Sequence, residues 1–322
     1  MTPSALVLWY SQTGQLRRAA EALVEPLEQA GFNVVWEELR PLAPYPFPWS
    51  PRGFLRVFPD AVLGVPAPLE PPAVVADERF DLVVIAYQVW FLAPSGPVAG
   101  LFETNLRAHL RGTPVVTLVA CRNMWYSAAA RMRRLVESAG GDHVGHVAVT
   151  DEGPAWATFV STPRWLLTGR RDRFLRVFPP AGVGEDAIAS LARFGRRIVE
   201  RADELRGARG LFEGLGRVQI EESMAVADLA GALAFRPWAA LIAAAEERGP
   251  VQRELATAAF ALWLVTTVPL AVPLMALARL PFRVAVDRAI RRYVETIAPG
   301  GVGAPGGDTL ESRRLEADAA LV

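Results

Sequence analysis

The amino-acid sequence predicts an α/β fold with an open, all-parallel sheet, and three observations support this. Strand-like and helix-like stretches alternate through the first 150 residues. The strand-like stretches are short continuous apolar runs, such as residues 5–10, which is typical of strands covered on both faces. The helix-like stretches repeat apolar residues at helical spacing; in residues 15–30 these are Leu16, Ala19, Ala20, Leu23, Val24 and Leu27.

The predicted elements follow one another in a regular order. We expect strands over residues 5–10, 32–39, 81–86, 114–120 and 144–150. We expect helices over residues 15–30, 98–110, 127–139 and 185–205. Right-handed crossovers between parallel strands place helices on both faces of such a sheet. Five strands connected in this way favour the flavodoxin-like order 2-1-3-4-5, in which ligands bind at the carboxyl ends of the strands.

The chain divides into three predicted regions. Residues 1–206 form the α/β domain, which contains a long insert over residues 41–72. Ten prolines and the aromatic run Tyr45, Phe47 and Trp49 favour a packed insert, such as a lid or a substrate wall, over a solvated linker. Residues 207–298 are predicted to be helical and apolar, and one interpretation is that this region associates with a membrane. Residues 299–322, rich in glycine and charge, are predicted to form a flexible tail.

Composition excludes several functions. The 34 basic and 34 acidic residues balance, so we expect no nucleic-acid partner. All basic residues are arginine, which excludes a Schiff-base lysine and a P-loop lysine. The one cysteine, Cys121, forms no intramolecular disulfide, and the three histidines His109, His143 and His146 predict no metal site.

Residues 256–278 form an uncharged stretch of 23 residues, long enough to cross a bilayer. Pro269 and Pro273 interrupt it, and an arginine-rich segment follows. A single span obeying the positive-inside rule would place the N-terminal domain outside, yet the N-terminus shows no signal region and predicts a cytoplasmic protein. The sequence therefore favours a kinked hairpin or an interfacial helix, peripheral on the cytoplasmic face of the inner membrane. A buried hairpin in a soluble protein, or a homodimer interface, is the alternative.

The turn between the first strand and the first helix predicts a phosphate site. Its residues are Ser11, Gln12, Thr13, Gly14 and Gln15. Small hydroxyl side chains and a glycine let main-chain amides surround a dianionic phosphate at a helix N-terminus. Neither lysine nor metal is needed, which suits the phosphomonoester of flavin mononucleotide (FMN) better than ATP. An ordinary capped helix start is the alternative.

Two further loops follow the third and fourth strands, at the same edge of the sheet. The first contains the predicted flavin-binding residues Gln88, Val89, Trp90 and Phe91; aromatic surface from Tyr87, Trp90 and Phe91 suits an isoalloxazine ring, and loop amides suit its pyrimidine edge. The second contains Cys121, Arg122 and Asn123, predicted both to bind cofactor and to act in catalysis. Arg122 is suited to hold a carboxylate or offset charge on reduced flavin, and Asn123 offers a donor and an acceptor. Cys121 is either a nucleophile or, as its lack of a visible base favours, a small buried thiol.

Five ordered motifs resemble the bacterial dialkylresorcinol condensing enzymes, which are treated as flavin-dependent aromatases. They are YSQTGQL (10–16), PYPFPW (44–49), AYQVWFLAPS (86–95), ACRNMW (120–125) and TPRWLLTG (162–169). The resemblance spans most of residues 5–170 and continues more weakly beyond; the wider likeness is to flavodoxins and flavodoxin-like quinone reductases. Leu16 departs from the threonine common in flavodoxin phosphate loops.

The resemblance implies a specific reaction. A partner ketosynthase would join two fatty-acyl-derived chains into a lipid-like cyclohexanedione carboxylic acid. The present protein would oxidise that ring to a dialkylresorcinol, with decarboxylation, using FMN. Two alternatives stay open: a Cys121-dependent condensing enzyme, and a flavodoxin-like electron carrier or quinone reductase.

Overall fold

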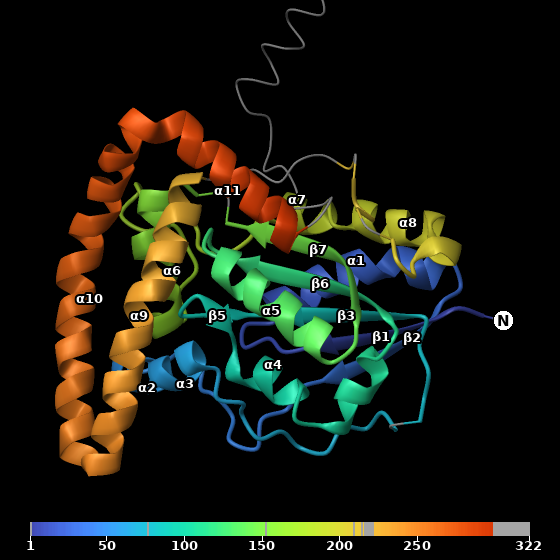
Figure 1. Ribbon diagram of the computed structural model, residues 1–322, viewed down its shortest axis with the longest axis horizontal. Helices are drawn as coiled ribbons and strands as arrows, with labels where there is room; N and C mark the ends of the chain where they lie inside the picture. Colours follow the sequence, from blue (N-terminus) through green and yellow to red (C-terminus); the bar gives the residue numbers. More distant parts are fainter. Residues whose placement is uncertain are drawn as a thin grey trace, which may run out of the picture.

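The protein contains a five-stranded sheet in which all neighbouring strands are parallel, in the order β2-β1-β3-β6-β7 (Figure 1). The strands are β1 (Ser4–Trp9), β2 (Asn33–Glu38), β3 (Leu82–Tyr87), β6 (Pro114–Cys121) and β7 (Asp142–Thr150). The predicted order 2-1-3-4-5 is confirmed. This computed structural model describes residues 2–75, 77–151, 153–208, 210–213, 215 and 222–298, without the side chains of Ala155 and Trp156. The predicted tail, residues 299–322, lies outside the described residues.

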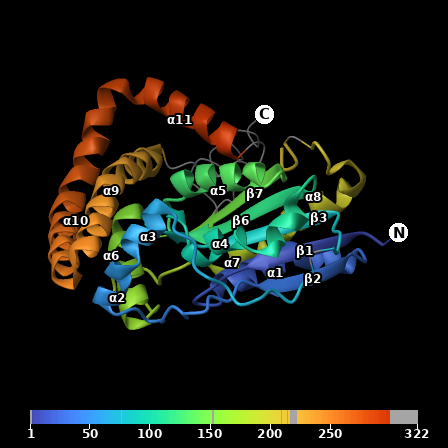
Figure 2. The same cartoon turned by 60° about the horizontal axis from the view of Figure 1, so that its bottom comes forward.

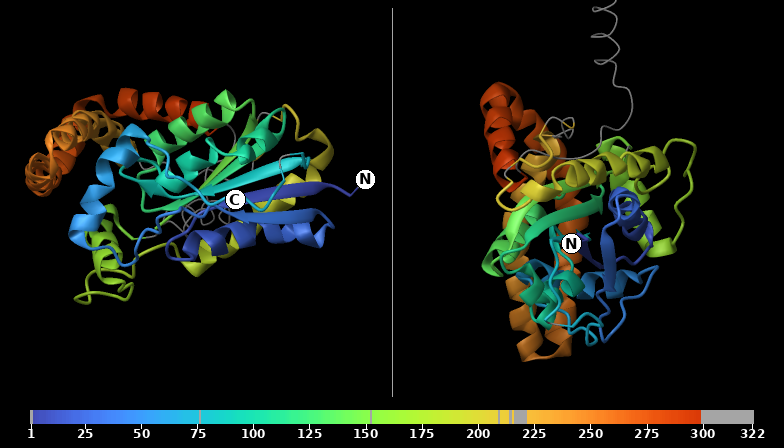
Figure 3. Two further views of the ribbon diagram at one scale, coloured as in Figure 1. Left: turned by 90° about the horizontal axis from the view of Figure 1, so that it is seen from below. Right: turned by 90° about the vertical axis from the view of Figure 1, so that its right-hand side faces the viewer.

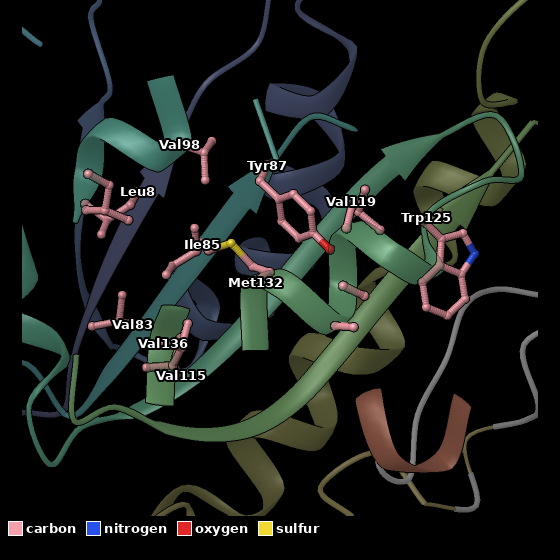
Figure 4. Packing of buried hydrophobic residues seen from close by; sticks show 14 of the residues in the cluster. Leu8, Val83, Ile85, Tyr87, Val98, Val115, Val119, Trp125, Met132 and Val136 are labelled. Atoms are coloured by element: carbon pink, nitrogen blue, oxygen red, sulfur yellow. The ribbon is translucent and has the colours of Figure 1, made fainter. Parts of the chain in front are cut away.

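Helices cover both faces of the sheet, as Figures 2 and 3 show from two sides. One face carries α1 (Gln15–Gln29), α7 (Glu185–Ala189) and α8 (Ala192–Glu200); the other carries α4 (Gly96–Leu101), the 3₁₀ helix η1 (Asn105–Leu110) and α5 (Tyr126–Ser138). Alternate residues of one strand therefore enter different cores. Leu6 and Leu8 of β1 face α5, whereas Ala5 and Val7 face α1. Figure 4 shows Met132 of α5 packed toward Ile85 on the first of these faces.

Two predicted helices are broken in the structure. The helix expected over residues 98–110 is α4 followed by η1, and the helix expected over 185–205 is α7, α8 and the 3₁₀ helix η2 (Ala202–Glu204). At each break a hydroxyl donates to the carbonyl three residues earlier: Thr104 to Leu101 and Ser190 to Ala187, at 2.8 and 2.7 Å. Such local hydrogen bonds compete with those of a continuous helix.

The insert over residues 41–72 is packed, as its aromatic residues predict. It contains α2 (Pro51–Arg56) and α3 (Phe58–Leu63), and Pro41 pairs with Leu69 to close it. Trp49 and Phe58 are buried. Whether the insert acts as a lid or a substrate wall stays a prediction.

The C-terminal helices lie across the carboxyl end of the sheet. The long helices α9 (Glu222–Arg248) and α10 (Pro250–Arg279) run side by side, and α11 (Arg283–Ile297) returns over α5 after the 3₁₀ turn η3 (Leu280–Phe282) (Figure 1). The helix α6 (Ala155–Thr168), which contains most of the TPRWLLTG motif, lies at the same end. The core beneath α1 and α8 extends beyond residue 206, through Ala208, Leu211 and Phe212.

Because two histidines are buried, we expect the protein to lose stability in acid. The Thr117 hydroxyl lies 2.9 Å from His143 Nε2 and 2.8 Å from His146 Nδ1. Burial lowers the pKa of His143 to about 4 and that of His146 to about 3. Because the unfolded chain binds these protons near pH 6.5, stability is full above that pH and declines as the pH falls toward about 3. At pH 5 the fully buried His146 alone is expected to remove about 2 kcal/mol from the unfolding free energy.

Thermal melting between pH 8 and pH 5 checks this expectation. A His143→Asn/His146→Asn variant keeps polar partners for Thr117 but does not titrate, so its melting temperature is expected to change much less over this range. Equal acid sensitivity of the variant and the wild type would contradict the assignment.

Candidate functional site

The start of α1 presents hydrogen-bond donors that the protein itself leaves unused. Gly14 adopts φ of +75°, which turns the chain from β1 into the helix. No described carbonyl accepts a hydrogen bond from the N–H groups of residues 11–14. The Ser11 hydroxyl oxygen is buried and has no partner among the described residues. Amides, a hydroxyl and the positive end of a helix dipole together fit the phosphate of FMN.

The two glutamines of this loop have structural partners. The Gln15 side-chain amide donates to the Val183 carbonyl at 2.9 Å and accepts from the Val183 N–H at 3.0 Å. Gln12 donates to the Pro46 carbonyl and accepts from the Trp49 indole, both at 3.3 Å. Their side chains therefore position the loop. The groups that remain to bind an anion are the Ser11 hydroxyl and the main-chain N–H groups of Thr13 and Gly14.

The second loop is a tight hairpin. Its strands are β4 (Val89–Trp90) and β5 (Ala93–Pro94), and Ser95 N–H donates to the Gln88 carbonyl at 2.9 Å. The turn residues Phe91 and Leu92 have φ of +48° and +66°, values that side chains larger than glycine rarely adopt. Strain of this kind is concentrated at functional sites. The Gln88 side-chain oxygen is buried without a partner among the described residues, so it also remains available to a ligand.

The aromatic residues of this loop point in three directions. Trp90 lies edge-on to Tyr45 at 4.8 Å, to Trp49 at 5.6 Å and to Tyr10 at 6.0 Å between ring centroids. Phe91 instead packs against Phe54 and Phe58 of the insert. Tyr87 is wholly buried on the face that α5 covers, as Figure 4 shows. Its expected role as flat surface for a flavin ring is therefore wrong. Of the three aromatic residues, Trp90 is the one that contacts Tyr10, which precedes the phosphate loop, and Trp49, which donates to Gln12.

The third loop follows β6 and contains the predicted residues Cys121, Arg122 and Asn123, all partly buried. The Arg122 guanidinium lies 3.8 Å from the ring centre of Phe159 on α6. Asp151, at the end of β7, donates its N–H to the carbonyls of Cys121 and Arg122, both at 3.1 Å. Its carboxylate accepts from Gly153 and Gly182 at 2.9 Å each, which ties the third loop to the segment beside α1. Burial and the negative charge of Asp228 raise the pKa of the Cys121 thiol, so this cysteine is a poor thiolate nucleophile.

Asp228 on α9 is a site residue that the sequence analysis did not single out. Its side chain is fully buried, and Oδ1 accepts from the N–H of Ser127 at 2.9 Å, in the first turn of α5. Oδ2 has no partner in the described part of the chain. Burial raises the pKa of Asp228 to about 6, and its charge also acts on Tyr87 and Cys121. A lone acid among the apolar residues 224–235 is the sequence signal that could have identified it.

Four of the five motifs, all except ACRNMW (120–125), contact one another at this end of the sheet. Gln12 contacts the PYPFPW segment, and Trp49 of that segment donates its N–H to the Leu166 carbonyl of α6 at 2.8 Å. Phe47 and Trp165 lie edge-on at 6.1 Å. Trp90 joins the second loop to the same aromatic cluster. These four motifs, which are separated in sequence, therefore form one continuous structure around the start of α1.

Two surface cavities lie elsewhere. One, of about 560 Å³, lies between η1 and the end of α5, and the other, of about 430 Å³, lies beside α1 and Trp36. Neither is lined by residues of the three loops, where the insert contacts the phosphate loop through Pro46 and Trp49. Among the described residues, no group of three or more His, Cys, Asp or Glu side chains is arranged to hold a metal ion.

Comparison with known proteins finds similar solved structures, but it assigns the sequence to no family. No protein-family model and no curated protein matches the sequence. A flavoprotein from Lactobacillus acidophilus NCFM, solved in complex with FMN, is 16% identical with a TM-score of 0.37, over 46% of this chain and 93% of that one. A putative flavoprotein from Bacteroides eggerthii DSM 20697 is 19% identical with a TM-score of 0.33, over 43% and 84%. An NAD(P)H:quinone oxidoreductase from Methanothermobacter marburgensis is 16% identical with a TM-score of 0.29, over 52% and 99%.

Proposed function

We propose that this protein binds FMN at the carboxyl end of its sheet and is a flavin-dependent oxidoreductase. The observation that carries the proposal is the start of α1, where the N–H groups of residues 11–14 and the buried Ser11 hydroxyl have no partner in the part of the chain that the structure describes. The unpartnered Gln88 oxygen at the neighbouring loop offers an acceptor for an N–H on a flavin ring. FMN, when bound, supplies a hydride acceptor.

We further propose that the substrate is a lipid-like cyclohexanedione and the product a dialkylresorcinol, the aromatase reaction implied by the five motifs. Conversion of the ring removes one hydride and one proton from ring carbons, two electrons in all, and tautomerisation completes the aromatic ring. Loss of CO₂ from a β-keto acid needs no oxidant. The protein must therefore provide a proton acceptor and exclude water. The ketosynthase that would supply the substrate stays a prediction.

Asp228 is the carboxylate that this chain offers as proton acceptor. Its charge acts on Cys121 and Tyr87, its Oδ2 has no partner among the described residues, and a pKa of about 6 leaves it ionised at neutral pH. General bases are most effective when their pKa lies near the working pH. We assign to Arg122, on the third loop, the role of orienting a carboxylate or enolate oxygen of the substrate.

Two spectroscopic experiments test the proposal. The purified protein is expected to be yellow and to release FMN on denaturation; a colourless protein that binds no added FMN would refute the cofactor assignment. Under anaerobic conditions, one equivalent of a 2,5-dialkylcyclohexane-1,3-dione is then expected to bleach the flavin absorption and yield one equivalent of resorcinol. Bleaching by NAD(P)H, with no response to the dione, would instead favour the quinone-reductase alternative.

The condensing-enzyme alternative requires a reactive Cys121 thiolate. Because burial and Asp228 raise the pKa of this thiol, we expect Cys121→Ser to retain aromatisation within about threefold of the wild type, since a merely packed thiol tolerates a near-isosteric change. Single-turnover formation of resorcinol from a synthetic dione measures this directly. Loss of more than about a hundredfold, with FMN binding intact, would restore a chemical role for the thiol.

A further inference from the structure

The outer face of α10 is an extended apolar surface with no partner in the described part of the protein. Leu262, Val265, Leu270, Leu274 and Leu277 are each between 62% and 72% exposed. The opposite face packs inward, where Phe260 stacks on Phe58 of α3 at 3.8 Å between ring centroids. Isolated exposed leucines are common, but a contiguous row over several helical turns marks an interaction surface.

Both ends of α10 are attached to the same folded unit. Near its start, Glu254 pairs with Arg52 of α2 at 2.7 Å, and Arg253 donates to the Arg56 carbonyl at 3.2 Å. After its end, α11 returns over α5, where Ile290 and Val294 are buried. A perpendicular crossing of a bilayer would require one of these attachments to break. The helix is therefore placed to lie along a surface, as its position at the edge of the molecule shows (Figure 1).

The chemistry of this surface favours lipid over a second protein copy. Residues 256–278, about 35 Å of helix, contain no charge. Within Pro250–Ile297, an 18-residue window has a mean hydropathy of 2.0, and 6% of that window is buried. Pro269 and Pro273 lie inside α10, and proline is more frequent in helices surrounded by lipid than in helices of water-soluble proteins.

Positive charge flanks the apolar face on one side. The exposed arginines of α11 are Arg283, Arg288, Arg291 and Arg292, against the acids Asp287 and Glu295. Arg291 pairs with Glu222 of α9 at 2.7 Å, and Arg283 lies 3.6 Å from Asp287. Asp287 is already paired with Arg279 at 2.6 Å. Arginines beside an apolar helix face complement the anionic headgroups of a bilayer surface.

We propose that the outer face of α10 docks in the plane of an anionic lipid bilayer, with the α11 arginines at the headgroups. This binding site is independent of the flavin chemistry. The position of α10 nevertheless matters for substrate entry. Phe58, against which α10 packs, contacts Phe91 of the hairpin at 5.1 Å between ring centroids. A substrate with long alkyl chains would therefore enter next to the membrane without leaving an apolar environment.

Flotation with vesicles tests the proposal on the full-length protein. The wild type is expected to float with vesicles of phosphatidylcholine and phosphatidylglycerol, and more weakly with phosphatidylcholine alone. Leu270→Glu/Leu274→Glu is expected to reduce the bound fraction about tenfold or more. Leu42→Glu/Val75→Glu, which changes two equally exposed apolar residues away from α10, is the matched control and should bind as the wild type does.

Three outcomes would overturn the proposal. Equal flotation of the wild type and the α10 variant would show that the outer face of α10 does not contact the lipid. A wild-type dimer that the α10 variant converts to a monomer, without vesicle binding by either, would assign the face to a second copy. Alkaline carbonate should release the wild type from membranes; retention would contradict an in-plane arrangement. Circular dichroism melting of both variants establishes that their folds are intact.

Discussion

Replacing Ser11 with aspartate is expected to abolish FMN binding while leaving the fold as stable as the wild type. The Ser11 hydroxyl is buried at the start of α1, with no hydrogen-bond partner among the residues that the structure describes. A carboxylate there interacts favourably with the helix dipole and the unused N–H groups, so the protein itself tolerates it. The same carboxylate occupies the anion site and repels the FMN phosphate. We expect affinity to fall by about a thousandfold, from a lost charged hydrogen bond and added repulsion.

Quenching of flavin fluorescence during titration measures this affinity, and riboflavin is the matched control ligand. Riboflavin lacks the phosphate, so its weaker binding is expected to be similar in wild type and Ser11→Asp. Ser11→Ala, which removes only the hydroxyl, should weaken FMN binding by about tenfold to a hundredfold. If Ser11→Asp binds FMN as tightly as the wild type, the phosphate does not lie at this loop.

Replacing Asp228 with asparagine is expected to lower the rate of aromatisation by about a hundredfold to ten-thousandfold, which is the usual contribution of a positioned general base. Activity needs the ionised carboxylate, whose pKa is about 6. The wild-type rate should therefore be at its plateau above pH 7 and fall about tenfold per pH unit below pH 6. The asparagine variant, which does not titrate, is expected to lose this acid limb.

A purely structural role for Asp228 predicts different results. Asparagine keeps an oxygen that can accept from the Ser127 N–H at the start of α5, so capping is retained. The raised pKa means that the ionised carboxylate costs the folded protein about 3 kcal/mol at neutral pH, because the unfolded chain ionises near 3.8. We therefore expect Asp228→Asn to melt at the same temperature or higher. A stable variant with unchanged kcat and an unchanged pH profile would show that Asp228 only caps α5.

Local sequence patterns were sufficient to predict the fold. Apolar runs identify the strands because parallel strands are buried on both faces, and the phosphate loop is identifiable because its small residues and glycine stand directly between a strand and a helix. Residues such as Ser11 and Gly14 could therefore be placed from the sequence at the start of α1, and the packed insert could be predicted from Trp49 and its neighbours.

Contacts between distant segments could not be predicted in this way. The helix breaks at Thr104 and Ser190 depend on whether a hydroxyl bonds its own helix, which spacing does not reveal. Tyr87 comes directly before the second loop, but a shift of one position along a strand decides whether a side chain points into a core or toward the loops at the end of the sheet. Asp228 reaches α5 from a helix about 100 positions later, because the fold lays α9 across the carboxyl end of the sheet.

The paired hydrogen bonds between Gln15 and Val183 have a consequence for biogenesis. They join residues 168 positions apart. During translation all five sheet strands emerge before Val183 does, so a nascent α/β core can assemble while the phosphate loop still lacks its distal support. On the proposed function, we therefore expect FMN to bind late, and a chain truncated near residue 180 to have a complete sheet but weak affinity for FMN.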